Sequence, residues 1–137
     1  MLGEAALTAE DAQRYMESYR SAIEAIGRRK RPDSVFESPS ISVKLSALHP
    51  RFEQGQRERV LRELTPRLLE LAQLAKANRI ALTVDSEEAD RLRLLLDVFE
   101  QVILDPSRQE PPAAIRRLKG LLLSYRLQIG SLSLQLR

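Results

Sequence analysis

The rest of the chain is arranged around the stretch from Ile41 to Phe52, which reads ISVKLSALHPRF. Apolar and polar residues alternate at its start, in the order Ile41, Ser42, Val43, Lys44, Leu45 and Ser46. This period of two predicts a β-strand with one apolar and one polar face. Lys44 therefore points away from the apolar face, near the carboxyl end of the predicted strand.

A second stretch, IALTVD from Ile80 to Asp85, has the same design. Its apolar face carries Ile80, Leu82 and Val84, and Asp85 falls on its polar face. A helical pattern follows each strand, which is typical of parallel α/β units whose functional side chains gather at the strand ends. Lys44 and Asp85 therefore indicate either a site for a small anionic or zwitterionic molecule or a structural ion pair.

The first predicted helix runs from Thr8 to Gly27 and precedes the first strand. Thr8 and Asp11 form an approximate capping box, and Gly27 suits the C′ position. The apolar residues recur every three or four positions and define one inward face: Ala12, Tyr15, Met16, Tyr19, Ala22, Ile23 and Ile26.

The second predicted helix covers residues 54–78 and joins the two strands. Pro66 lies inside this range, so either the helix is kinked there or two shorter helices abut. Asn78 suits a C-cap. The inward face of this helix is predicted from the same spacing: Val60, Leu61, Leu64, Leu68, Leu71, Leu74 and Ala75.

The third predicted helix begins at a Ser86 cap, with Glu87 and Glu88 in its first turn, and stops at Asp105 and Pro106. The two glutamates either complement the helix dipole or belong to a site. The predicted inward face contains Ala89, Leu92, Leu95, Leu96, Phe99, Val102 and Ile103. Beyond Pro106, residues 113–126 favour a basic helix and residues 127–136 a strand.

Composition excludes several classes of function. The chain has 137 residues, 43% of them hydrophobic and 30% charged, which suits one globular domain. It contains no cysteine and one histidine, His49, so thiolate chemistry and a multi-histidine metal cluster are excluded. His49 precedes a proline and is either a turn residue or a catalytic one. No apolar run is long enough to span a membrane and no signal peptide is recognisable, so a cytoplasmic location is expected.

The net charge of +3 invites a nucleic-acid interpretation. The dense basic run is Arg28 to Arg31, without interleaved aromatic residues, and a solvated loop explains it as well. A glycine-rich phosphate loop, a nucleophile elbow and a paired-histidine metal motif are all absent from the sequence.

The run ISVKLSALHPRF resembles the motif of bacterial proline dehydrogenases, in particular the proline dehydrogenase domain of the bifunctional proline utilisation A flavoproteins. The resemblance extends to MLGEAALTAEDAQRYMESYRSAIEAIG before it and LTVDSEEADRLRLLLDVFE after it, over about residues 1–105. Family members usually have tyrosine in place of Phe52 and alanine in place of Ser86.

The resemblance implies an α/β fold, namely a partial (βα)₈ TIM-barrel-like fragment with two parallel strands and three helices. The implied domains are residues 1–105 for the partial barrel and 106–137 for a divergent tail. The family oxidises L-proline to Δ1-pyrroline-5-carboxylate by hydride transfer to FAD, and the electrons pass to quinone. By position, Lys44 matches a lysine that binds the proline carboxylate, Asp85 matches an aspartate beside flavin and substrate, and Glu4 matches a glutamate that pairs with an arginine of the last helix.

A complete barrel of this type needs at least about 200 residues. The expectation is therefore a proline dehydrogenase fragment that is inactive in isolation, because most FAD contacts belong to strands outside it. The full-length protein is expected in the cytoplasm, peripheral to the inner membrane face, as a homo-oligomer and without nucleic-acid binding by this segment. The alternative is a small α/β binding or interaction module without redox activity, and a weaker one is a nucleic-acid binder that uses Arg28 to Arg31.

Overall fold

The computed structural model describes residues 3–28, 39–85, 87 and 89–104. The chain divides into two compact units, Met1–Val102 and Ile103–Arg137, and the sheet with the helices that pack on it belongs to the first. The expectations for Ser86, Glu88, the end of the third helix at Asp105, the tail and most of the basic run from Arg28 to Arg31 lie outside the described residues.

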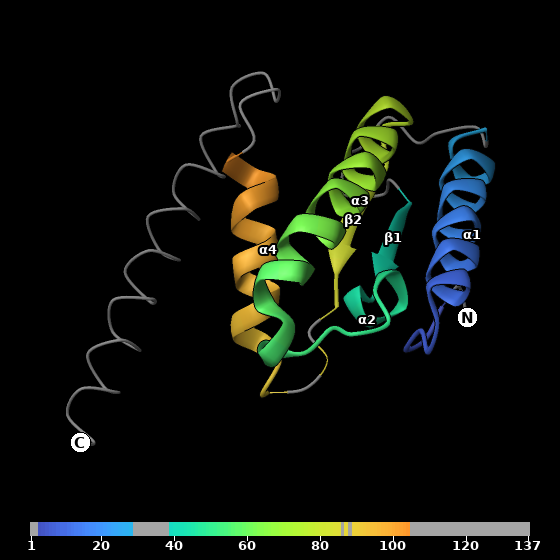
Figure 1. The fold of residues 1–137 in the computed structure, drawn as a ribbon. Helices are drawn as coiled ribbons and strands as arrows, with labels where there is room; N and C mark the ends of the chain where they lie inside the picture. The colour runs from blue at the N-terminus through green and yellow to red at the C-terminus, as the bar shows by residue number, and fades with distance from the viewer. Residues whose placement is uncertain (1–2, 29–38, 86, 88, 105–137) are drawn as a thin grey trace. The chain divides into compact units, whose positions relative to one another are not determined.

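Two parallel strands form the sheet of the first unit. Strand β1 (Ser40–Val43) pairs with β2 (Ala81–Val84), in a register that sets Ser40 opposite Ala81 and Val43 opposite Val84. Figure 1 shows the two strands side by side, with α3 connecting them. This arrangement confirms the α/β expectation, because a parallel pair needs a crossover connection of this kind.

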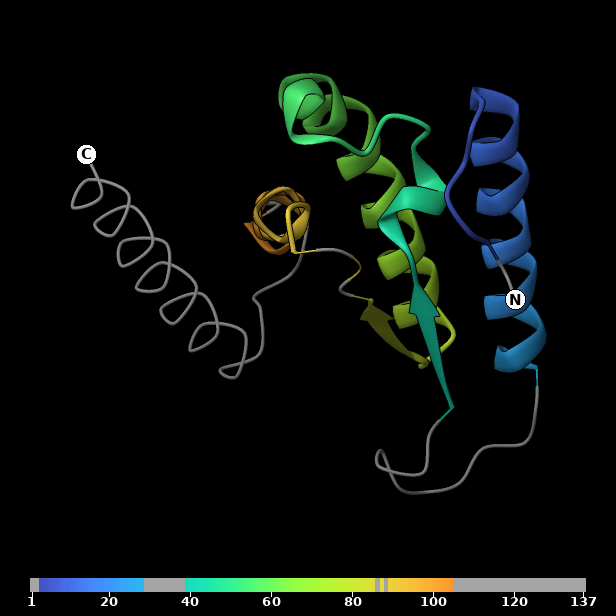
Figure 2. The ribbon, with the colours of Figure 1, turned by 90° about the horizontal axis from the view of Figure 1, so that it is seen from below.

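Helices cover one face of the sheet. The buried cluster joins Ile41 and Val43 of β1 to Tyr19 of α1 (Ala9–Gly27) and to Leu68 and Leu71 of α3 (Arg57–Ala77). Figure 2 shows α1 and α3 beside each other along the strands. The opposite face carries the small residues Ser40, Ser42, Ala81 and Thr83.

Helix α1 has the predicted start. Thr8 is its N-cap, and its hydroxyl accepts the amide N–H of Asp11 at 3.1 Å. The Asp11 carboxylate accepts the amide N–H of Thr8 at 3.0 Å, which completes the capping box. Hydrogen bonds from the Thr8 backbone and hydroxyl are the main reason that the pKa of Asp11 is lowered, although desolvation opposes them. The helix therefore begins where the sequence pattern places its cap.

The end of α1 differs from the prediction. Gly27 is the last helical residue rather than a C′ residue, and Arg28 caps the helix with a φ of −76°. The described glycines have no positive φ, so backbone freedom does not explain Gly27. A Cβ at this position would meet Cγ of Asn78 at 2.8 Å and Cβ of Asn78 at 2.9 Å. Gly27 is needed because α1 approaches the end of α3 closely.

Helix α3 is one continuous helix and contains Pro66. A short 3-10 helix, η2 (Gln54–Gln56), precedes it, so the predicted start at residue 54 is three residues early for the α-helix. Asn78 is the C-cap, as predicted, and its side-chain amide donates to the carbonyl of Leu74 at 2.9 Å. Arg79 follows with a φ of 52°, a left-handed residue that turns the chain into β2.

Strand β1 is shorter than the alternating pattern predicts. It ends at Val43, and residues Leu45–Leu48 form a short helix, α2, so the assignment of Leu45 and Ser46 to the strand is wrong. All four residues of α2 are buried. Beyond Val43 the amide N–H of Lys44 donates to the hydroxyl oxygen of Tyr19 in α1, and the hydroxyl of Ser46 donates to Glu87.

Helix α4 (Leu92–Leu104) begins later than predicted. Residues 89–91 form a turn before it, so Glu87 does not lie in a first helical turn. The inward face is rotated as well: Leu94 and Val98 are fully buried, whereas Leu92 is 40% exposed and Ala89 is exposed. The predicted burial of Leu95, Val102 and Ile103 is confirmed.

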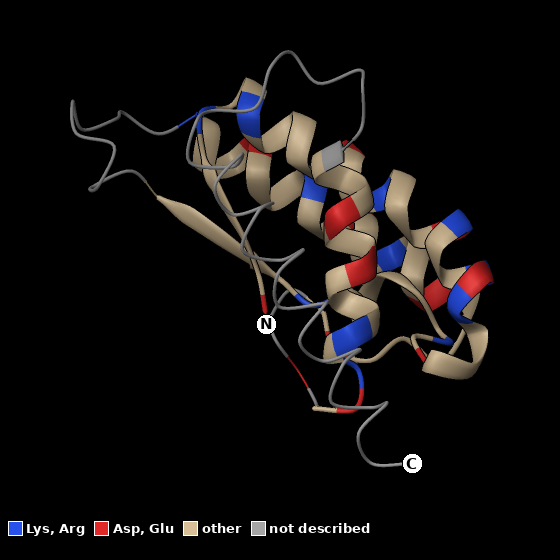
Figure 3. Ribbon diagram, turned by 90° about the vertical axis from the view of Figure 1, so that its left-hand side faces the viewer, with Lys and Arg blue, Asp and Glu red and all other residues tan. Residues whose placement is uncertain are grey.

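The surface charge of the described helices is mixed. Figure 3 shows basic and acidic positions interspersed along the helices. Several of them form pairs, such as Arg20 with Glu70 at 2.6 Å and Arg14 with Asp11 at 2.5 Å. Among the described residues, no helix is long and apolar enough to cross a bilayer.

Candidate functional site

The strand ends bring Lys44 and Asp85 to the same edge of the sheet. Val43 lies opposite Val84 in the parallel register, so the next residue of each strand is Lys44 and Asp85. The amide N–H of Asp85 donates to the carbonyl of Val43 at 3.0 Å, which extends the ladder by one bond. The prediction that these two residues meet at adjacent strand ends is confirmed.

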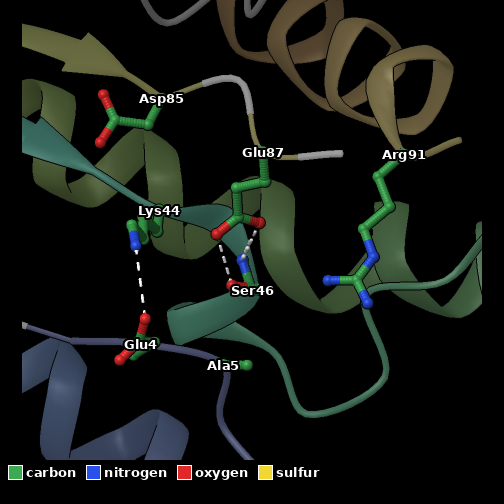
Figure 4. Close-up of a pocket in the computed structure, with 7 residues that line it drawn as sticks. All are labelled: Glu4, Ala5, Lys44, Ser46, Asp85, Glu87 and Arg91. Atoms are coloured by element: carbon green, nitrogen blue, oxygen red, sulfur yellow. Dashed lines mark hydrogen bonds and ion pairs between the residues drawn. The ribbon is translucent and has the colours of Figure 1, made fainter. Parts of the chain in front are cut away.

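A pocket of about 390 Å³ opens at this edge. Its volume falls in the range of small-molecule sites. Figure 4 shows the seven residues that line it: Glu4, Ala5, Lys44, Ser46, Asp85, Glu87 and Arg91. Lys44, Asp85 and Glu4, the site residues expected from the sequence, are among them. The lining combines two cationic and three anionic side chains, which suits a zwitterionic ligand more than an apolar one.

Lys44 forms an ion pair with Glu4. Its Nζ lies 3.8 Å from Oε1 of Glu4, and the side chains are 33% and 68% exposed. Glu4 is held close to α2 by its neighbour Ala6, whose amide N–H donates to the carbonyl of Ser46 at 2.9 Å. An exposed pair at this distance contributes at most about 1 kcal/mol. Lys44 therefore keeps donors available for a ligand.

Asp85 is oriented by a side chain on the polar face of β1. The hydroxyl of Ser42 donates to Oδ1 of Asp85. Among the described residues, Lys44 pairs with Glu4 and makes no ion pair with Asp85. The structure therefore speaks against the alternative of a Lys44–Asp85 ion pair and leaves one Asp85 oxygen facing the pocket.

The sequence pattern missed Ser46, whereas a site role for Glu87 was one of its two alternatives and agrees with the place of Glu87 in the pocket lining. The Ser46 hydroxyl donates to Oε1 of Glu87 at 2.5 Å, and the Ser46 amide N–H donates to Oε2 at 3.4 Å. Glu87 thus caps the start of α2 and ties it to the chain after β2 (Figure 4). The interpretation of Glu87 as a dipole complement within α4 does not fit this contact. The signal available in the sequence was the position of Glu87 two residues after Asp85.

His49 lies outside the pocket. It is 2% exposed, and its Nδ1 accepts the amide N–H of Arg51 at 3.1 Å. The neutral ring therefore carries its proton on Nε2, which lies 3.1 Å from the Glu63 carboxylate. Burial lowers the pKa of His49, and the hydrogen bond and charge of Glu63 oppose this shift. These contacts favour the structural interpretation of His49 over the catalytic one.

The end of α2 is fixed by the part of α3 that carries Glu63, the partner of His49. Arg67 donates to the carbonyl of Leu48 at 2.8 Å, and Glu63 also receives hydrogen bonds from Arg59 at 3.1 and 3.2 Å. Arg51 is exposed and pairs with Glu53 at 3.3 Å.

The described residues contain no cluster of three or more metal-ligating side chains. The pocket at the strand ends is therefore the candidate site.

Comparison with known families gives a match over most of the chain. A sequence model described as "Proline dehydrogenase" matches residues 1–116. The bifunctional protein PutA of Salmonella typhimurium is 54% identical over 106 residues, which are 77% of this chain and 8% of that protein. The bifunctional protein PutA of Rhizobium meliloti is 52% identical over 98 residues, which are 72% of this chain and 8% of that protein.

Solved structures agree with these relatives. A proline utilization A (PutA) structure from Bradyrhizobium japonicum superposes with a TM-score of 0.75 and 58% identity, over 78% of this chain and 11% of that chain. PutA from Bdellovibrio bacteriovorus superposes with a TM-score of 0.65 over 77% of this chain and 12% of that chain, and at 22% identity it supports the fold alone.

The matched domains are TIM-barrel-like, which confirms the predicted fold class for the two-stranded unit. The chain spans about a tenth of the length of the proteins that it matches. The family match over residues 1–116 and the identity to these relatives show that this chain belongs to the proline dehydrogenase family.

Proposed function

We propose that this chain supplies part of the substrate side of an FAD-dependent proline dehydrogenase, which oxidises L-proline to Δ1-pyrroline-5-carboxylate. One observation carries the proposal: Lys44, Asp85 and Glu4 line a single pocket at the carboxyl ends of two parallel strands. In (βα)-barrel enzymes the active site forms at this end of the strands.

Lys44 binds the carboxylate of proline in this proposal. Its ammonium is a compact charge with three donors, and the 3.8 Å pair with Glu4 leaves donors for a ligand oxygen. The side chain is 33% exposed, so a ligand reaches it while its stem remains partly shielded from water. A partly shielded site strengthens the attraction between the ammonium and the carboxylate.

In this proposal Asp85 would accept hydrogen bonds that orient the substrate and the flavin. Ser42 fixes one of its oxygens, so the other keeps a defined direction. The pocket of about 390 Å³ fits proline together with the edge of a flavin ring, and the cations Lys44 and Arg91 fit the negative charge of a reduced flavin. When bound, the flavin accepts the hydride from proline. The remaining FAD contacts come from outside the described residues.

Glu4 closes the pocket in this proposal. Its side chain is 68% exposed and precedes α1, where it can meet an arginine contributed by the last helix of the barrel. In this proposal quinone would be the electron acceptor, and the full-length protein would lie in the cytoplasm, peripheral to the inner membrane face. In this proposal the full-length protein is a homo-oligomer.

The experiment is a segment exchange. In the bifunctional protein PutA of Salmonella typhimurium, the 106-residue matching segment is replaced by that of this chain, and proline oxidation is measured with a quinone acceptor. The exchanged protein is expected to bind flavin and oxidise proline. Lys44→Met in that protein is expected to raise KM for L-proline at least about tenfold, because a charge-assisted hydrogen bond contributes roughly 1.5–3 kcal/mol.

The control is Lys76→Met, which removes an exposed lysine in the last turn of α3, outside the pocket. Its KM is expected to match that of the exchanged protein. Equal KM values for Lys44→Met and Lys76→Met would refute the substrate role of Lys44.

A further inference from the structure

The turn from β1 into α2 places the Lys44 side chain, and a residue of α1 holds this turn. The amide N–H of Lys44 donates to the hydroxyl oxygen of Tyr19 at 3.3 Å. The two residues are 25 positions apart, and Tyr19 belongs to the helix that precedes β1. Val43 bonds to β2 through its carbonyl, so the N–H of the next residue, Lys44, points away from β2, and Tyr19 supplies its partner.

Tyr19 is suited to hold a fixed direction. Its residue is 1% exposed, and its ring belongs to the buried cluster that joins α1, β1 and α3. Close packing limits the ring to one rotamer, so the hydroxyl has a defined position. The pKa of the Tyr19 phenol is raised, chiefly by desolvation and further by the charges of Asp85 and Glu87, although the Lys44 hydrogen bond opposes the shift. The phenol therefore stays neutral at physiological pH.

The same turn fixes the direction of the Lys44 side chain. Lys44 has φ −92° and ψ 126°, an extended conformation, and its carbonyl accepts the amide N–H of Ala47 at 3.2 Å. With both backbone groups bonded, the Cα–Cβ direction of Lys44 is set by α1 on one side and by α2 on the other. Figure 4 shows the resulting side chain within the pocket, next to Glu4.

We propose that Tyr19 is a positioning residue, which aims the Lys44 ammonium at the ligand carboxylate through the backbone of Lys44. The proposal rests on the substrate role of Lys44 given above. Among the described residues, Tyr19 is not part of the pocket lining, so its hydroxyl acts through Lys44. Loss of the hydroxyl therefore weakens ligand binding without removing a ligand contact.

The first test concerns the hydrogen bond and uses the 137-residue chain. Tyr19→Phe keeps the ring and removes the hydroxyl, and Tyr15→Phe is the control on the same helix. Amide hydrogen exchange is measured by NMR. The exchange rate of the Lys44 amide is compared with the rates of the β1 amides in the same protein. In Tyr19→Phe this relative rate is expected to rise about twofold to tenfold, the range for one lost hydrogen bond. In Tyr15→Phe it is expected to stay unchanged. An unchanged ratio in Tyr19→Phe overturns the proposal.

The second test concerns function and uses the segment-exchanged PutA protein. Tyr19→Phe is expected to raise KM for L-proline about threefold or more, with kcat changed by less than about twofold. In the Lys44→Met background the same substitution is expected to leave KM unchanged, because the ammonium that it positions is gone. An equal rise in both backgrounds shows that Tyr19 acts independently of Lys44 and overturns the proposal.

The two tests separate this inference from the proposed function. If Lys44→Met leaves KM unchanged, the substrate role of Lys44 fails, and the positioning role fails with it. If Lys44→Met raises KM but Tyr19→Phe changes neither KM nor the exchange of the Lys44 amide, only the positioning role fails.

Discussion

Gly27 shows how one missing side chain permits two helices to meet. A Cβ at this position would lie 2.8 Å from Cγ and 2.9 Å from Cβ of Asn78. The side-chain amide of Asn78 also caps α3 by donating to Leu74. Because the Cβ of Asn78 cannot move without the backbone, the contact cannot be relieved by a simple rotation.

Gly27→Ala is therefore expected to lower the free energy of unfolding by about 1–3 kcal/mol, despite the higher helix propensity of alanine. Urea unfolding followed by circular dichroism measures the change. Gly55→Ala is the matched control, since nothing lies within 4 Å of its Cβ position. A Gly27→Ala protein as stable as Gly55→Ala would show that the close approach of α1 and α3 is not required.

His49 links stability to pH. Its pKa in the folded state is lowered, chiefly by burial, although Glu63 opposes the shift and Arg59 and Arg67 add to it. The unfolded chain therefore takes up a proton more readily than the folded chain. The neutral His49 ring makes its full contribution to the free energy of unfolding above the pKa of histidine in the unfolded chain, about 6.5. This contribution falls as the pH decreases below that value.

The free energy of unfolding is thus expected to decrease between pH 7.5 and pH 5.5, by at most about 1.4 kcal/mol per pH unit. Urea titrations at several pH values measure the slope. His49 is the only histidine in the chain, so His49→Asn is expected to remove most of the dependence in this range. If the free energy of unfolding of His49→Asn still depends on pH in this range, a group other than His49 causes the dependence.

The residues of the pocket differ in how far a sequence pattern reveals them. Lys44 and Asp85 follow from alternation along two strands, because alternation and parallel pairing are local rules. Ser46 and Glu87 depend on a contact 41 residues apart, and Tyr19 depends on one 25 residues apart. Such contacts leave no periodic signal. Glu4 was identified by resemblance alone, and the structure places it in the same pocket.

At the scale of elements, α3 contains an unusual feature. Pro66 is the tenth residue of a 21-residue helix and is exposed. It has no N–H, so the carbonyl of residue 62 cannot receive its usual helical bond. Pro66→Ala is expected to raise the free energy of unfolding by about 1 kcal/mol or more, measured by urea unfolding.

Gln73→Ala on the exposed face of the same helix is the control and is expected to change stability by less than about 0.5 kcal/mol. A destabilised Pro66→Ala protein would indicate that α3 needs proline at this position in order to pack on the sheet.

The sequence predicts the end of a helix correctly where a capping residue marks it. The box of Thr8 and Asp11 and the cap at Asn78 gave a correct start for α1 and a correct end for α3. The predictions for the end of β1 and the start of α4 are wrong, and both places make contacts with residues far away in the sequence, Lys44 with Tyr19 and Glu87 with Ser46, which a local pattern does not contain. The inward face of α4 shifted with its start.

At the scale of the whole molecule, the described strands form a sheet of two, whereas a (βα) barrel closes on eight. The isolated 137-residue chain is therefore expected to bind no flavin and to leave L-proline unoxidised. Absorbance after incubation with FAD and gel filtration measures the first property. The segment-exchanged PutA protein is the positive control. A yellow and active 137-residue chain would show that the segment is self-sufficient.

The uncovered face of the sheet carries only small side chains at Ser40, Ser42, Ala81 and Thr83. If eight such strands curve into a ring, this face looks toward the axis. Short side chains leave free volume there, so bulky groups from opposite strands can occupy the axis without steric conflict. Substitution of Ser40, Ala81 or Thr83 by a larger residue would then disturb closure of the ring even though it leaves this segment's own packing intact.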